Sequence, residues 1–303
     1  MSDMTPPVAA GATAAARAAA ESGGFGRPAR LGLFALVAAG PVLLVVLPVA
    51  SFFVLSFWRV QNGAITPDAT LANYGAFFSS PAYWRTFLMT LLLAAEVTAI
   101  GIAIGYPVAY FIWRRRGRLR TFLLLLFVLP LFMSYIVKIY TMRSILGLSG
   151  LLNQVLVASG LLEAPSLLFL YNRTAILITM AVIFLPFVIL PVYLSLERIP
   201  ASLLAASADL GAGVATTFRH VVLPLSLPGT VAGALFAFVL ALGDFVTPQM
   251  VGGPSGFTFG RVIWSQFGLA FNWPFGAALG VILFVVALAV IIAGGWAAGR
   301  QRV

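Results

Sequence analysis

Long apolar segments with few charges dominate this sequence, and they decide what kind of protein it can form. A helix of about 20 apolar residues is long enough to cross the hydrocarbon core of a bilayer. Of the 303 residues, 61% are hydrophobic and only 9% are charged. So few polar side chains cannot cover the surface of a water-soluble domain. The sequence therefore predicts an all-α integral membrane protein.

Six apolar segments have the length of a transmembrane helix. Between the third and fourth of them, glycine and proline divide residues 141–173 into runs too short to cross a membrane. We expect an interfacial or re-entrant helix around 151–162 in that region. The six predicted spans are 31–58, 85–113, 121–140, 174–196, 229–250 and 275–298.

The distribution of arginine predicts the orientation, because positive residues collect in the cytoplasmic loops of membrane proteins. Five arginines follow the second predicted span, between Arg114 and Arg120. This loop is therefore expected on the cytoplasmic side, which places both termini there as well. Residues 1–30, rich in Ala, Gly, Ser and Pro, are expected to form a cytoplasmic tail before a transmembrane domain over 31–303. The same rule accounts for the net charge of +10 without nucleic acid.

The residue inventory excludes several kinds of site. The sequence has no cysteine, so disulfides and thiolate metal sites are excluded, and its single histidine, His220, rules out a histidine cluster. The single lysine, Lys138, lies in an apolar segment. A phosphate-binding loop of the form G-x-x-x-x-G-K-[ST] is therefore absent, and any ATPase must be a separate subunit.

The loop over residues 199–229, between the fourth and fifth predicted spans, looks built to dock another protein. Pro200 can begin a helix and Gly211 can end one, which predicts a short helix over 201–210. Pro224 and Pro228 are expected to mark the return into the membrane. The alternative is an ordinary cytoplasmic helical hairpin.

Three charged residues fall inside predicted spans: Glu96, Lys138 and Asp244. A charge at a helix centre costs about 2.5–3.5 kcal/mol on insertion scales, so each is a candidate functional residue. Carboxylates and aromatic faces would suit a permeating cation. The alternative is that Lys138 pairs with one of the two carboxylates and holds helices together. The candidate pathway residues are Glu96 and Asp244, with Tyr140, Phe245 and Trp264 as aromatic walls.

The loop resembles the cytoplasmic coupling loop of ABC importer permeases. The family pattern is Glu-Ala-Ala, three residues, Gly, nine residues, an aliphatic residue, any residue, then Leu-Pro. Ala205 stands where the family has Glu, and Asp209, one helical turn further on, is a candidate substitute. The residues that fall at the family spacing are Ala205, Ala206, Ser207, Gly211, Val221, Leu223 and Pro224.

Further stretches are similar to the spermidine/putrescine branch of these permeases. They include SYIVKIYTMRSIL over 134–146, LPFVILPVYLSLERI over 185–199 and ALGDFVTPQMVGGPSGFTFGRVIWSQF over 241–267. Related branches that carry other small solutes share much of this pattern, so another solute stays open.

The resemblance implies a type I ABC importer permease fold with a coupling helix between spans four and five, in a bacterial inner membrane. It implies a transport subunit and not an enzyme. A second homologous permease, two ATP-binding subunits and an extracytoplasmic solute-binding protein would be its partners. Mg-ATP would be used by the ATPase, and this chain would bind no cofactor.

The residues argue against two other classes of protein. An ion-gradient-driven secondary transporter often has inverted repeats, and the two halves of this chain show no convincing repeat. A membrane-embedded enzyme would have to use Glu96 and Asp244 for acid–base chemistry, and no recognisable motif surrounds them.

Overall fold

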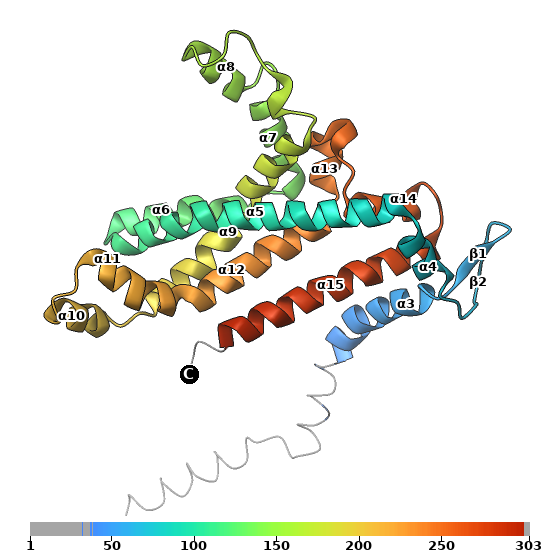
Figure 1. Ribbon diagram of the computed structural model, residues 1–303, viewed down its shortest axis with the longest axis horizontal. Coiled ribbons are helices and arrows are strands. Elements are labelled where there is room, and N and C mark those ends of the chain that lie inside the picture. The colour runs from blue at the N-terminus through green and yellow to red at the C-terminus, as the bar shows by residue number, and fades with distance from the viewer. Residues whose placement is uncertain (1–31, 33–36, 38, 300–303) are drawn as a thin grey trace, which may run out of the picture. The chain divides into compact units, whose positions relative to one another are not determined.

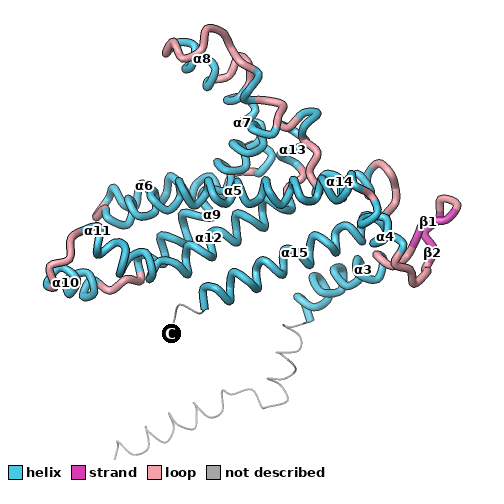
Figure 2. The backbone as a smooth tube through the Cα atoms, viewed as in Figure 1, coloured by secondary structure: helices cyan, strands magenta, loops and turns pink. Residues whose placement is uncertain are grey.

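The structure is a computed structural model that describes residues 32, 37 and 39–299. It divides into two compact units between Val54 and Leu55, and each unit is described by itself. The described residues are almost entirely helical, with one short β-hairpin (Figures 1 and 2). The predicted tail over 1–30 lies outside the described residues.

The described part of the first unit is one apolar helix. A π-helical turn η1 (Val42–Val46) follows Pro41 and continues into α3 (Leu47–Leu55). Most of its side chains are exposed, as suits a helix in lipid. The start of the predicted span over 31–58 lies among residues that the structure does not describe, and the helix ends at Leu55, before Trp58.

The second unit begins with small elements that precede its long helices. Strands β1 (Arg59–Gln61) and β2 (Ala64–Thr66) form an antiparallel hairpin, and α4 (Ala72–Ser79) follows. Asn62 and Gly63 at the hairpin turn both have positive φ, the conformation that an Asn-Gly turn favours.

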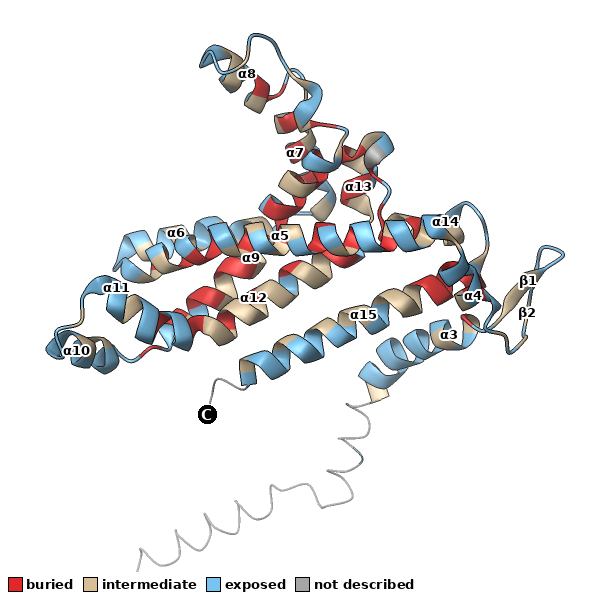
Figure 3. Cartoon of the chain, viewed as in Figure 1, coloured by how far each residue is buried: buried red, intermediate tan, exposed pale blue. Residues whose placement is uncertain are grey.

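Four helices of the second unit are long and apolar enough to cross a membrane. The helices α5, α9 and α12 pack against one another, and α15 packs against α12. Buried side chains follow their contact faces, while the outer faces are exposed (Figure 3). The bounds are α5 (Pro81–Arg114), α9 (Arg173–Glu197), α12 (Leu223–Gly243) and α15 (Trp273–Gly299).

Small residues let these helices approach closely. Gly229 and Gly233 of α12 face the backbone of α9, and a Cβ added at Gly229 would lie 2.4 Å from the carbonyl oxygen of Pro191. Gly101 and Gly105 of α5 face the side chain of Val188 on α9. Gly229 and Gly233, four residues apart, therefore form a close helix contact with α9.

The predicted span over 121–140 is not one continuous helix. The chain forms a bent pair, 118–132 and 135–158, with an angle of 107° between the two parts. Pro130 lacks an N–H, and Met133 is extended, so the helical hydrogen bonds stop there. Counted as one span, the pair raises the number of candidate spans in the described residues from four to five. The pair contains α6 (Arg118–Val128), η2 (Leu129–Phe132), α7 (Tyr135–Leu146) and α8 (Leu151–Ala158).

The predicted fifth span over 229–250 is also shifted. A continuous helical segment begins at Val214 and ends at Gly243, so Pro224 lies within it and not at its border. A π-helical turn immediately precedes Pro224; its wider backbone accommodates a ring that would clash with a regular helix. The elements between α9 and α12 are α10 (Ala201–Asp209), α11 (Val214–Thr217) and the π-turn η4 (Phe218–Val222).

Short helices complete the unit. They are η3 (Leu167–Phe169), α13 (Val246–Val251), η5 (Gly253–Ser255) and α14 (Phe259–Gly268). Figure 1 shows α14 at the end of the long helices opposite α10 and α11, and α13 beside α7 where α7 and α8 project from the side.

Candidate functional site

A cavity of ≈ 420 Å³ lies between α7, α9 and the junction of α12 with α13. It brings together residues that are far apart in the sequence, and its wall combines a carboxylate, an ammonium group and aromatic rings. The lining residues are Tyr135, Lys138, Ile183, Phe184, Phe187, Val239, Leu240, Gly243, Asp244, Phe245 and Val246.

Asp244 lies at the break between α12 and α13 and not inside a span as expected. Its side chain is 8% exposed. Oδ1 accepts hydrogen bonds from the N–H groups of Val246 (2.9 Å) and Thr247 (3.1 Å), the first two residues of α13. The hydroxyl of Tyr135 donates to Oδ2 and also lies 2.8 Å from Oγ1 of Thr247. Asp244 therefore caps α13 and fastens it to α7, while its role in a pathway stays a prediction.

Lys138 does not form the ion pair that the sequence allowed. Within residues 39–299, the ion pairs within 4.0 Å are Arg59 with Asp68, Arg120 with Glu197 and Arg173 with Glu96. The Lys138 Nζ lies 5.7 Å from the centroid of the Tyr135 ring, an arrangement that favours cation–π attraction.

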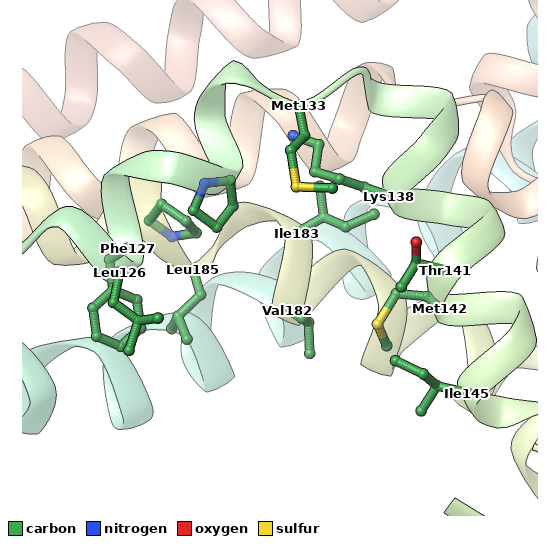
Figure 4. A pocket seen from close by; sticks show the side chains of 12 residues that line it. Leu126, Phe127, Met133, Lys138, Thr141, Met142, Ile145, Val182, Ile183 and Leu185 are labelled. Atoms are coloured by element: carbon green, nitrogen blue, oxygen red, sulfur yellow. The ribbon is translucent and has the colours of Figure 1, made fainter. Parts of the chain in front are cut away.

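A second cavity adjoins the first at Lys138. It has a volume of ≈ 350 Å³ and lies at the bend between α6 and α7, where it is almost entirely apolar. Lys138 and Ile183 line both cavities. Figure 4 shows Lys138 and Met133 on one side of this cavity and Val182, Ile183 and Leu185 of α9 on another.

Glu96 pairs with Arg173, the first residue of α9, with Nη2 2.6 Å from Oε2. The two side chains are 31% and 45% exposed. The sequence did not reveal this partner, because Glu96 was expected inside the second span and Arg173 lies just before the fourth predicted span, 77 residues later. Glu96 is not among the residues that line either cavity.

The aromatic candidates divide into two groups. Phe245 lines the ≈ 420 Å³ cavity, and the ring of Trp264 stacks on it with centroids 6.2 Å apart and planes at 14°. Tyr140 is 53% exposed and does not line that cavity. Tyr135 and Phe184, stacked at 6.4 Å, were missed. The available signal was that Tyr135 precedes Lys138 by three residues, which places both on one helix face.

The coupling candidates gather at one end of the long helices, where Figure 1 shows α10 and α11. Ala205, Ala206 and Asp209 of α10 are exposed, while the Ser207 hydroxyl lies 2.8 Å from that of Thr217. Gly211, with φ 75°, ends this helix in the left-handed region. Leu223 and Pro224 are exposed at the start of α12.

Comparison with known proteins identifies the family. Residues 100–302 match the family described as "binding-protein-dependent transport system inner membrane component". The chain is 39% identical over 236 residues to the inner membrane ABC transporter permease protein YdcU of Escherichia coli, with 74% of each chain covered. It is 37% identical over 217 residues to the spermidine/putrescine transport system permease protein PotB of Haemophilus influenzae, covering 72% of this chain and 75% of that one.

A solved structure has the same fold. A bacterial ABC transporter that imports the acidic polysaccharide alginate matches with a TM-score of 0.73 at 16% identity, covering 89% of this chain and 94% of that one. Together with the apolar helices, these similarities describe a multi-pass inner membrane protein that transports and does not catalyse. The chain belongs to the family of binding-protein-dependent transport system inner membrane components, as the permease subunit of an ABC importer.

Proposed function

We propose that this permease carries a small cationic solute of the spermidine or putrescine kind. The observation that carries the proposal is the ≈ 420 Å³ cavity, which Asp244 lines together with the aromatic residues Tyr135, Phe184, Phe187 and Phe245. A partly desolvated ammonium ion is attracted both by a carboxylate and by the faces of aromatic rings.

The charge of this wall also predicts what the other half of the pathway contributes. Lys138 lines the same cavity as Asp244, so the two charges leave the wall close to neutral. A solute with two or more positive charges needs further carboxylates to offset its desolvation. We expect the second permease to supply them.

The relatives support the polyamine class. PotB is named as a spermidine/putrescine permease, and the similarity covers about three quarters of both chains. The second candidate is another small solute of a related branch, because the other similar permease, YdcU, is named without a solute. Family membership removes the earlier alternative of an ion-gradient-driven transporter.

The proposed assembly follows the family. This chain pairs with a second, homologous permease, and two ATP-binding subunits hold the coupling loops, here residues 199–229. An extracytoplasmic binding protein delivers the solute. The ATP-binding subunits use Mg-ATP, and this chain binds no cofactor.

The proposed topology has six spans in the inner membrane. The bent pair and the helix that ends at Leu55 join the four long helices, so that both termini and the tail over 1–30 are cytoplasmic. The basic residues between Arg114 and Arg120 support this orientation, since they then lie inside.

The test is uptake of radiolabelled spermidine and putrescine by proteoliposomes that contain the whole complex. Asp244→Asn is the informative variant, because the amide oxygen still accepts from Val246 and Thr247 while the charge is lost. A hydrogen bond between the solute and a charged group contributes about 1.5–3 kcal/mol to binding, so we expect loss of the Asp244 charge to lower uptake roughly tenfold to hundredfold. Glu163→Gln, an exposed carboxylate, is the matched control.

Two outcomes count against the proposal. If neither polyamine enters or stimulates ATP hydrolysis in a complex that assembles, the solute is not a polyamine. If uptake is normal in Asp244→Asn, polyamines do not depend on this carboxylate.

A further inference from the structure

Phe218 connects the coupling loop to α5. It is the first residue of the π-turn η4, and its ring lies edge-on to two tyrosine rings one helical turn apart on α5. The centroid of Phe218 is 5.4 Å from that of Tyr110, with planes at 82°, and 6.1 Å from that of Tyr106, with planes at 84°. Perpendicular pairs at these distances are favourable arrangements of aromatic rings.

Hydrogen bonds extend this contact in both directions. Towards α10, the hydroxyls of Ser207 and Thr217 lie 2.8 Å apart, and Thr217 directly precedes Phe218. Towards the membrane, the hydroxyls of Tyr106 and Ser226 lie 2.7 Å apart, and both residues are buried. A continuous series of contacts therefore runs from α10 through Phe218 to α5 and α12.

The body of α10 does not pack tightly on α5. A cavity of ≈ 200 Å³ separates them, lined on one side by Tyr110 and Trp113 and on the other by Leu204, Ala208 and Ala212. Atoms that face a void lack the contacts through which a displacement is transmitted. Phe218 also lines this cavity, and its ring bridges to Tyr110 of α5.

The backbone is irregular in both segments that meet at the contact between Phe218 and α5. Residues 218–222 form a π-turn, and Pro107 lies inside α5 next to Tyr106. Both features interrupt regular helical hydrogen bonding and occur where helices bend. The contact thus joins two positions at which the helices can change direction.

A displacement of α5 would be transmitted to helices that line the ≈ 420 Å³ cavity. Leu93, Ala94 and Val97 of α5 share a buried cluster with Ile139 of α7 and Leu242 of α12. Both partners belong to helices that line the cavity.

We propose that Phe218 is the positioning residue that transmits displacement of α10 to α5, and so links ATP hydrolysis to rearrangement of the pathway. This inference rests on the proposed docking of the ATP-binding subunit on the loop over 199–229. Ser207 stands where the resembling family has Ala, and its hydrogen bond to Thr217 strengthens the link between α10 and Phe218. The same chain has Ala205 where the family has Glu.

The first test measures coupling. In proteoliposomes with the whole complex, Phe218→Ala and the milder Phe218→Leu are expected to reduce the spermidine taken up per ATP hydrolysed by about tenfold, a typical size for coupling between sites. Phe122→Ala on α6, which truncates an exposed aromatic residue, is the control. Thr217→Val, which removes one hydroxyl, is expected to act in the same direction.

The second test does not depend on the solute. The sequence has no cysteine, so spin labels can be placed at introduced cysteines. Labels at Ala201 of α10 and Ala99 of α5, both exposed, should keep one narrow distance distribution when ATP is added to the unsubstituted complex. In Phe218→Leu this distribution should widen or shift. The distance between labels at Ala99 of α5 and Ala289 of α15 should change when ATP is added to the unsubstituted complex, and should stay unchanged in Phe218→Leu.

The results separate the two proposals. If spermidine is not transported but the label distances respond to Phe218→Leu as described, the solute is wrong and the link stands. If the distances and the ATP-dependent change are the same with and without the Phe218 ring, the link is overturned, whatever the solute is.

Discussion

The hydroxyl of Tyr135 donates a hydrogen bond to Oδ2 of Asp244, a residue 109 positions later in the sequence. The bond fastens α7, which follows the 107° bend, to the start of α13. One side of the ≈ 420 Å³ cavity is therefore held by a polar contact between α7 and α13. Both helices begin directly after a break in the helical structure.

Tyr135→Phe should destabilise this junction without changing the packing of the ring, which stacks on Phe184. Loss of a hydrogen bond to a charged, buried partner is expected to cost about 1.5–3 kcal/mol. The measurement is thermal unfolding of the purified protein in detergent, with Tyr140→Phe, whose side chain is exposed, as control. Equal unfolding temperatures for the two variants would contradict the role of the hydroxyl.

Glu96 and Arg173 are expected to contribute little to stability. Both side chains are partly exposed, and pairs of this kind are worth roughly 0.2–1 kcal/mol in water. A double-mutant cycle of Glu96→Gln and Arg173→Gln, followed by thermal unfolding, measures the coupling. A coupling several times larger would mean that the pair is shielded from water in the assembled transporter.

The amide of Asn153 holds the segment around α8 together. It is fully buried, accepts from the N–H of Ser166 at 2.8 Å, and donates to the carbonyls of Gly147 and Ser166 at 2.9 and 3.1 Å. Asn153→Ala leaves the N–H and two carbonyls without this partner, so faster proteolysis near α8 is expected. Gln154→Ala is the matched control, because its side chain makes a single, exposed hydrogen bond. Equal rates of cleavage would refute this role.

The long helices could be predicted from the sequence because apolar length alone defines them. The spans predicted at 174–196 and 275–298 match α9 and α15 within two residues at each end. The predicted orientation rests on the distribution of arginine, and the predicted partners rest on the family resemblance. The hydrophobic pattern is sufficient to predict the bounds of a helix where one unbroken helix fills the whole apolar segment.

The pattern failed where helices bend or stop within apolar sequence. Apolar residues continue on both sides of Met133 and Ser134, and Pro130 does not fix the break, because prolines also lie inside the continuous helices α5 and α9. Asp244 was assigned to a span for the same reason, although α12 stops at Gly243. The cavity that contains it is formed by contacts between distant residues, and a single sequence does not reveal such contacts.

Gly229 is the position at which a single methyl group should do the most damage to the packing of α9 and α12. A Cβ there would lie 2.4 Å both from the Pro191 carbonyl oxygen and from Cβ of Ser195, and neither is the end of a flexible side chain. The helices would have to move apart, and overpacking of this kind costs about 1–3 kcal/mol or more. Gly280→Ala is the matched control, since a Cβ at Gly280 of α15 meets nothing within 4 Å.

Gly280→Ala should be neutral or slightly stabilising, because alanine favours a helix over glycine by about 1 kcal/mol in water. Gly229→Ala should lower the thermal unfolding temperature and the yield of assembled complex. The two variants make the same chemical change on two apolar helices, so their difference isolates the close approach to Pro191. If Gly229→Ala unfolds at the same temperature as Gly280→Ala, the two helices do not pack this closely in the membrane.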